Sequence, residues 1–175
     1  MTNYFELFEI PVSFHPDQGE VKKKYYELSR KYHPDRFTQA TGREYTEVLQ
    51  LSAKVNDAFK VLKNPDATMA YILKMNNLLQ DEEKYPLSPD FLMEMMELNE
   101  LAEDLEPNNE PAKVQVEATL KDLLDQWEQE VSALTNKYDD DQGMGEKLLQ
   151  IKDYYFRKKY LLRIKERIDK FAAHQ

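Results

Sequence analysis

The apolar residues in the first 75 positions of the chain recur every three or four residues, which is the spacing of one face of an α-helix. The clearest pattern follows Asp17 and Glu20, a D-x-x-E pair of the kind that caps a helix N-terminus. We expect this helix to begin near Gln18 and to end at Pro34, because proline disfavours helical dihedral angles in the residue before it. Its apolar face consists of Val21, Tyr25, Leu28 and Tyr32.

Three more helices are predicted in the same part of the chain. A short one covers residues 3–10 and ends before a proline. A polar loop then reaches about Gly42, and a longer helix follows it. The apolar residues of the longer helix are Val48, Leu51, Val55, Phe59 and Leu62. The pair Asn64-Pro65 ends that helix and begins the fourth, since asparagine caps helices and proline suits the first helical position.

Residues 77–88 are predicted to form a linker between two domains, at 1–76 and 89–175. The sequence from 80 to 90, QDEEKYPLSPD, contains two prolines and a cluster of charges. Such a composition is typical of a connecting segment and interrupts the helical pattern on both sides.

Beyond the linker, helical patterns cover residues 89–106, 111–137 and 144–172. Turn-forming residues separate them, at 107–109 and at 139–143. Short connections between long helices place neighbouring helices antiparallel, so we predict a three-helix bundle. The whole chain is therefore expected to be all-α.

The composition agrees with this expectation. Only 4 glycines occur in 175 residues, whereas residues that favour helices are plentiful. No run of 18 apolar residues could span a membrane, and the N-terminus lacks the basic and apolar segments of a secretory signal. The chain has no cysteine for disulfides or thiolate metal sites, and we expect a cytoplasmic protein.

The net charge of −9 is unevenly distributed along the chain. Residues 1–75 hold 11 Lys/Arg and 10 Asp/Glu, whereas residues 76–175 hold 13 and 23. This asymmetry suggests two units with different partners. An acidic chain also argues against binding of a nucleic-acid backbone, which needs a basic surface. Within the second half, residues 147–170 are basic and are expected to lie beside two acidic helices.

The tripeptide His-Pro-Asp occurs twice, at residues 15–17 and 33–35. In the first copy we expect Asp17 to cap a helix and its neighbours to be ordinary loop residues. The second copy, His33-Pro34-Asp35, follows a basic helix, and we name it the HPD loop. The basic residues around it are Lys22, Lys23, Lys24, Arg30, Lys31 and Arg36. A patch of this kind is either a solvated helix face or a docking surface for an acidic partner.

The first 75 residues resemble a J-domain. The segment YFELF at 4–8 is similar to the first-helix motif of that family, and residues 21–37 are similar to its second helix and loop. The segment VNDAF at 55–59 resembles the third helix, and residues 64–71 its end. The resemblance implies an antiparallel helical hairpin with short flanking helices. It also implies that the HPD loop docks on a DnaK-type heat-shock chaperone and stimulates its ATPase.

By position, the resemblance assigns chaperone binding to the HPD loop, to Lys22 and to Arg36. Tyr26 and Glu27 depart from the family, many members of which are basic there. This departure suggests a dedicated or differently tuned chaperone partner. Thr68 also replaces the usual arginine of the closing motif.

The helix predicted at 89–106 carries two sets of apolar residues. At 100° per residue, one set falls on a single face that is the natural bundle core. That set is Phe91, Met95, Leu98, Ala102 and Leu105. The other set shares its side of the helix with carboxylates, and together they are Leu92, Met93, Met96, Glu97, Glu100 and Asp104. An apolar strip rimmed by carboxylates indicates an interaction site, whereas the alternative is packing on the front domain or in a wide bundle core.

The segment FLME at 91–94 with its following glutamates, and RKKYL at 157–161, resemble the HscB family of J-type co-chaperones in iron–sulfur cluster assembly. The resemblance implies a roughly L-shaped molecule whose bundle holds an IscU-type scaffold protein and delivers it to an HscA- or DnaK-type chaperone. The implied scaffold-binding residues are Leu92, Met93, Met96, Glu97, Glu100, Asp104 and Tyr160. Phe156 is the alternative to Tyr160 on the same helix face. The pair Met95-Met96 departs from the family and affects fine client specificity.

Two alternatives stay open at this point. One is a J-domain adaptor for a different client protein. The other is an enzyme that uses His33 and Asp35 as an acid–base pair. The chain has no glycine-rich phosphate loop, nucleophile motif or clustered metal ligands, so we expect no catalytic residue, no cofactor and no bound metal. We also expect no nucleic-acid or membrane partner.

Overall fold

The computed structural model describes residues 2–37, 42–103, 110–136 and 144–173. Within these ranges the chain forms seven α-helices and one short 3₁₀ helix, and it contains no strand. The predicted all-α fold is confirmed. None of the helices in these ranges combines the length and the apolar character that crossing a bilayer requires.

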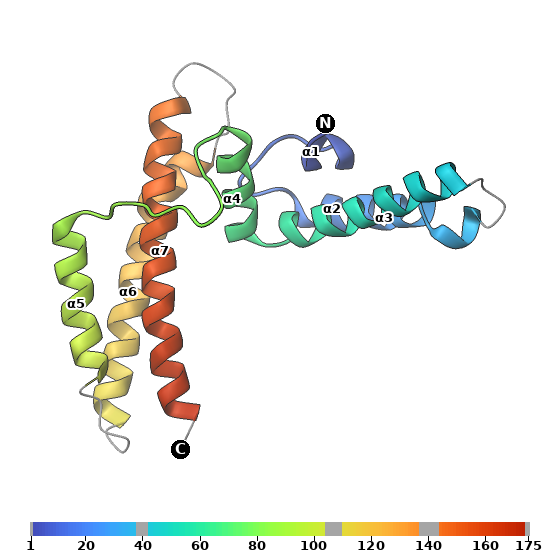
Figure 1. The fold of residues 1–175 in the computed structure, drawn as a ribbon. Coiled ribbons are helices and arrows are strands. Elements are labelled where there is room, and N and C mark those ends of the chain that lie inside the picture. The colour runs from blue at the N-terminus through green and yellow to red at the C-terminus, as the bar shows by residue number, and fades with distance from the viewer. Residues whose placement is uncertain (1, 38–41, 104–109, 137–143, 174–175) are drawn as a thin grey trace. The chain divides into compact units, whose positions relative to one another are not determined.

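Two compact units make up the structure. The first comprises residues 2–76 and takes in residues 135–136, and the second comprises the other described residues. The helices of the first unit are α1 (Tyr4–Phe8), α2 (Gln18–Lys31), the 3₁₀ helix η1 (Pro34–Phe37), α3 (Gly42–Leu62) and α4 (Pro65–Met75). The antiparallel helices α2 and α3 lie side by side as a hairpin (Figure 1).

Side-chain caps fix where α1, α2 and α4 begin. The Asp17 carboxylate accepts a hydrogen bond from the backbone N–H of Glu20 over 2.8 Å and starts α2, as the sequence predicts. Asn64 caps α4 in the same way, ahead of Pro65 at the first helical position. Each such cap stabilises the protein by about 1 kcal/mol, because it satisfies an N–H that has no partner within its helix.

The core of the first unit lies between the hairpin and the short helices. Tyr25 on α2 stacks on Phe59 on α3 with ring centroids 4.0 Å apart, and its hydroxyl donates to Asn56 Oδ1 over 3.0 Å. Tyr4 stacks on Tyr71 in the same manner, which ties α1 to α4. The largest fully buried side chains are Phe5, Phe8, Phe14, Val21, Val55, Leu62, Thr68, Ile72 and Leu73. These contacts fix the register of α2 against α3, the two helices on either side of η1.

The segment 77–88, predicted as a linker, belongs to the second unit and has no regular secondary structure. It packs on α7 nevertheless. The Tyr85 ring stacks on Phe156 with centroids 4.6 Å apart, and its hydroxyl donates to Asp153 over 3.1 Å. Lys152 forms an ion pair with Glu83 beside them. These side-chain contacts therefore hold segment 77–88 against α7, so it is not an unattached linker.

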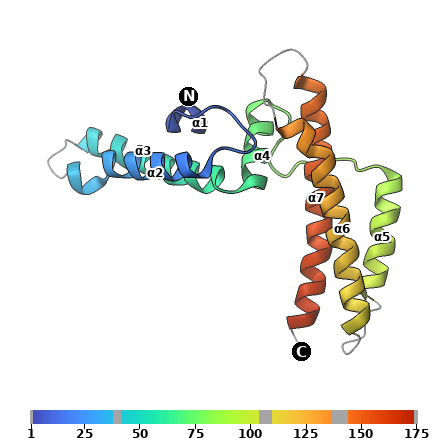
Figure 2. The ribbon, with the colours of Figure 1, turned by 180° about the vertical axis from the view of Figure 1, so that it is seen from behind.

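The rest of the second unit is the predicted bundle, made of α5 (Pro89–Glu103), α6 (Glu110–Thr135) and α7 (Met144–Ala173). Figure 2 shows the three helices running along one another, with α6 antiparallel to the other two. The buried residues include Phe91, Met95, Leu98, Leu120, Trp127, Leu148, Ile151, Leu161, Ile164 and Ile168. On α7 the i, i+4 spacing from Ile151 predicts Tyr155 for the core, but Tyr154 is buried there at 3% exposure and Tyr155 is only half-buried.

Candidate functional site

The HPD loop lies at the end of α2, where Tyr32 closes the helix and Pro34 begins η1. The side chains of His33 and Asp35 are 57% and 88% exposed. Their contacts are local: the Asp35 N–H donates to His33 Nδ1 over 3.3 Å, and the Arg36 N–H donates to the His33 carbonyl over 3.0 Å. An imidazole and a carboxylate that face solvent can both form charge-assisted hydrogen bonds with a partner protein.

A basic surface leads along α2 to this loop. Lys22, Lys23, Arg30 and Lys31 on α2, and Arg36 just after the loop, are all exposed. Lys24 is half-buried and pairs with Glu9, whereas the exposed Lys23 lies 3.6 Å from a carboxylate oxygen of Glu20. The ion pair with Glu9 raises the pKa of Lys24 and lowers the pKa of Glu9, chiefly through the hydrogen bond between them. The cations that remain suit the docking of an acidic surface.

Tyr26 and Glu27, the two departures from the J-domain pattern, lie on this same helix and are exposed. Tyr26 is 62% exposed although its neighbour Tyr25 is packed on Phe59. Both departures therefore change the surface that a partner would meet, and not the core.

The first His-Pro-Asp copy has a different role. Asp17 is used as the N-cap of α2, and the His15 N–H donates to Ser13 Oγ over 3.1 Å. The first copy lies before the start of a helix, whereas the HPD loop lies after the end of one. This difference agrees with the interpretation that only the second copy is a docking loop.

The second candidate surface is on α5. Met93 and Met96 are each 59% exposed, and Glu97 and Glu100 are exposed beside them. Leu92 is half-buried. The exposure of the two methionines excludes the alternative that they complete a wide bundle core. Asp104, the last residue predicted for this surface, lies outside the described residues.

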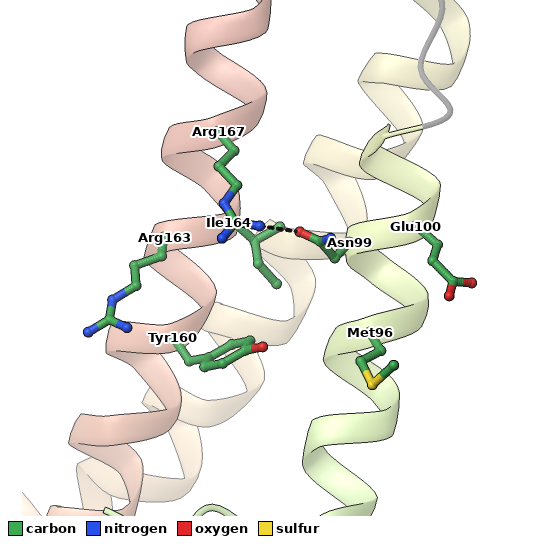
Figure 3. A pocket seen from close by; sticks show the side chains of 7 residues that line it. All are labelled: Met96, Asn99, Glu100, Tyr160, Arg163, Ile164 and Arg167. Atoms are coloured by element: carbon green, nitrogen blue, oxygen red, sulfur yellow. Dashed lines mark hydrogen bonds between the residues drawn. The ribbon is translucent and has the colours of Figure 1, made fainter. Parts of the chain in front are cut away.

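Tyr160 joins this surface from α7. A pocket of about 290 Å³ opens between α5 and α7, and Figure 3 shows the side chains around it. Its lining consists of Met96, Asn99, Glu100, Tyr160, Arg163, Ile164 and Arg167. The half-buried ring of Tyr160 meets Phe91 edge to face, with centroids 5.9 Å apart. Phe156, the alternative to Tyr160, is stacked on Tyr85 and contributes nothing to the pocket.

Four of these lining residues were missed by the sequence reasoning: Asn99, Arg163, Ile164 and Arg167. Arg163, Ile164 and Arg167 follow Tyr160 by three, four and seven positions, which is the spacing of one helix face. The signal was therefore present in the sequence, although the pairing of α5 with α7 is needed to see that this face meets Met96.

Two family models match the chain. The DnaJ domain model matches residues 3–71, and the HSCB C-terminal oligomerisation domain model matches residues 87–169. The co-chaperone protein HscB homolog of Photobacterium profundum is 38% identical over 133 residues, which cover 75% of this chain and 72% of the relative. The chain belongs to the HscB family of co-chaperones.

Other HscB proteins support this membership over nearly the full length. The co-chaperone protein HscB homolog of Vibrio vulnificus is 31% identical over 168 residues, 95% of each chain. Among solved structures, chaperone HscB from Vibrio cholerae has a TM-score of 0.75 and 25% identity, covering 98% of each chain. Human co-chaperone protein HscB has a TM-score of 0.76 and 27% identity, covering 95% of this chain and 80% of that one.

Each of the two family matches contains one of the candidate surfaces. The HPD loop and the basic face of α2 lie in the J-domain of this HscB family member. The pocket and the exposed side of α5 lie in its C-terminal HscB domain. Both surfaces are open and suit contact with another protein. In the described ranges, no three His, Asp or Glu side chains are grouped so that they could hold a metal ion.

Proposed function

We propose that this HscB family member stimulates ATP hydrolysis by a DnaK/HscA-type chaperone and delivers to it an IscU-type iron–sulfur scaffold protein. The strongest support is the HPD loop, which is exposed at the end of a basic helix within the DnaJ-matched segment. His33, Pro34 and Asp35, with Lys22 and Arg36, form the proposed chaperone contact. The chemistry takes place in the partner ATPase, so the proposal gives this chain no catalytic residue. It includes a cytoplasmic site of action, which these partners imply.

The proposal gives each part of the chain its own role. Residues 1–76 act as the J-domain, residues 77–88 connect, and residues 89–175 hold the scaffold protein. Scaffold binding uses the exposed strip of α5 and the ring of Tyr160. A chain that binds both partners raises the effective concentration of the scaffold at the chaperone, which couples delivery to ATP hydrolysis.

An ATPase assay tests the proposal. A DnaK/HscA-type chaperone from the same organism is assayed alone, with this protein, and with this protein plus the IscU-type scaffold. We expect stimulation by the protein alone and a further increase when the scaffold is added. A hydrolysis rate that stays at its basal value at saturating protein would refute the chaperone part of the proposal.

One observation favours a second candidate, a J-domain adaptor for a different client. Met93 and Met96 are both exposed, and methionine is frequent at surfaces that adapt to several partners. Affinity capture on the wild-type protein, repeated with the Leu92→Ala, Met96→Ala variant, distinguishes the two. Capture of the scaffold that is lost in the variant supports the first candidate. Capture of another protein with the same dependence supports the second.

A further inference from the structure

The pocket between α5 and α7 combines apolar surface with charges of both signs (Figure 3). Ile164, which is 3% exposed, provides apolar surface together with Tyr160 and Met96. The charges come from opposite walls: an acidic group on α5, and two guanidinium groups on α7. A ligand for this pocket therefore needs more than an apolar side chain.

These charges do not neutralise one another. Glu100, Arg163 and Arg167 are all exposed, and no ion pair in the described part of the chain joins Glu100 to either arginine. Arg163 has no ion-pair partner among the described residues. Arg167 donates from Nη1 to Asn99 Oδ1 over 3.0 Å, which orients it across the pocket. Because a guanidinium has five N–H groups, Arg167 keeps most of its donors for a ligand.

We propose that Arg163 and Arg167 bind a carboxylate of the scaffold protein. The scaffold-binding surface of this chain then has a basic side on α7 and an acidic side on α5. This inference rests on the proposed function. The two arginines are four residues apart on one helix face, and the planar guanidinium matches a carboxylate in two hydrogen bonds. The occupant is a scaffold segment with an apolar side chain for the pocket, a carboxylate beside α7 and a basic group beside Glu97 and Glu100.

Opposite charges on the two walls fix the direction of the bound segment. In the reverse direction, the carboxylate of the segment would meet Glu100 and its basic group would meet Arg163. Like charges brought together in this way disfavour the wrong orientation, which adds specificity beyond the apolar contact. Arg163 and Arg167 on α7 thus discriminate among client proteins that could bind Met93 and Met96 by apolar contact alone.

Binding of the IscU-type scaffold is measured by calorimetry at low and at high salt. The test variant is Arg163→Gln, Arg167→Gln, in which glutamine at 167 keeps a donor for Asn99. The control is Lys147→Gln, Lys165→Gln, which removes the same charge from exposed positions of α7 that do not line the pocket. We expect the test variant to raise Kd about threefold to tenfold at low salt and less at high salt. The control keeps the wild-type affinity.

Equal affinity and equal salt dependence in the test variant and the control overturn the inference. The Leu92→Ala, Met96→Ala variant then separates this failure from failure of the proposed function. If this variant loses scaffold binding, the proposed function stands and only the assignment of Arg163 and Arg167 is wrong. If this variant also binds normally, the assignment of scaffold binding to the α5 surface is wrong. Arg163→Gln alone, at an exposed side chain without an ion-pair partner among the described residues, repeats the test in a variant that leaves the Asn99 contact untouched.

Discussion

The backbone N–H of Asp35 donates a hydrogen bond to Nδ1 of His33 over 3.3 Å. In the tautomer whose Nδ1 accepts this bond, the ring proton is on Nε2, which is then a donor. The same Nδ1 lies 3.7 Å from Oδ2 of Asp35. The contact between Asp35 and His33 orients the exposed imidazole ring and leaves its Nε2–H for a hydrogen bond with a partner protein.

His33→Gln is expected to abolish stimulation of a DnaK/HscA-type ATPase. Glutamine has no imidazole ring and cannot reproduce the direction that the Asp35 N–H gives to the Nε2–H. Steady-state ATP hydrolysis, measured with increasing amounts of variant, gives the result. Scaffold binding is expected to stay at the wild-type level, because the variant leaves α5 and α7 unchanged.

The chain offers its own control, His15→Gln, which makes the same change in the other His-Pro-Asp copy. We expect His15→Gln to stimulate as the wild type does, because Asp17 of that copy caps α2 and Nε2 of His15 contacts Thr135 Oγ1 over 2.9 Å. Equal loss in both variants would contradict the assignment of docking to the HPD loop.

Leu92→Ala with Met96→Ala is expected to weaken scaffold binding by about 2–4 kcal/mol, or roughly a factor of 30 or more in Kd. Met96 is 59% exposed, and Leu92 is half-buried beside the core residue Phe91. Titration calorimetry with the scaffold protein measures the change.

The matched control for this surface is Val114→Ala with Leu149→Ala. These side chains are 59% and 53% exposed on α6 and α7, and neither lines the pocket beside Tyr160. The control removes similar apolar area and is expected to bind normally. If the control loses as much affinity as the test variant, a general effect on the bundle explains the loss and the α5 surface is not the site.

The sequence predicted the helices well wherever a cap marks their start. Asp17 and Asn64 are local signals, since each acts on an N–H three residues away. The buried positions Phe91, Met95 and Leu98 on α5 were predicted as well, because a short helix keeps its apolar stripe in phase with the 3.6-residue turn. On α2 only Val21 of the predicted face is fully buried, and the other three residues are half-buried.

What the sequence did not reveal depends on contacts between distant segments. On α7 the difference is local to one turn: Tyr154 is buried in place of Tyr155, whereas Leu161, Ile164 and Ile168 further along are buried. Both tyrosines are compatible with helical spacing after Ile151, so periodicity alone does not choose between them. The docking of Tyr85 on Phe156 and the position of Arg167 beside Asn99 join residues far apart in the chain. Periodicity within one segment carries no information on such pairs.

Thr68→Val is expected to lower the free energy of unfolding of the first unit by about 0.5–1.5 kcal/mol. The hydroxyl of the fully buried Thr68 donates to the Val61 carbonyl over 3.0 Å, which ties the start of α4 to the end of α3. Valine has the same shape and no donor. The Val61 carbonyl keeps the bond from the Asn64 N–H, so the loss stays moderate.

Urea denaturation followed by circular dichroism measures this effect. Thr68→Ser is the control, because serine keeps the hydroxyl and loses only a methyl group. A valine variant as stable as the wild type, together with a weakened serine variant, would show that packing and not the hydrogen bond holds this junction.

The ion pair between Glu83 and Lys152 predicts an acid-dependent part of the stability of the second unit. The hydrogen bond from Lys152 lowers the pKa of Glu83 below its ordinary value of 4.5. A carboxylate whose pKa is lower in the folded state stabilises the fold above its unfolded pKa, and this contribution is lost as pH falls through the lowered value. Glu83→Gln is therefore expected to destabilise the second unit by about 1 kcal/mol or less at pH ~7. The difference from the wild type should disappear well below pH ~4, where the carboxylate is protonated.

Trp127 is the chain's single tryptophan and is buried in the bundle, so its fluorescence reports unfolding of the unit that contains the ion pair. Urea denaturation is followed by this signal at neutral and at acid pH. Glu82→Gln is the control, because the exposed neighbour loses the same charge without losing the contact to Lys152. A Glu83→Gln deficit that is the same at both pH values would mean that glutamine disturbs the packing of Tyr85 on Phe156, and that the charge on Glu83 does not stabilise this segment.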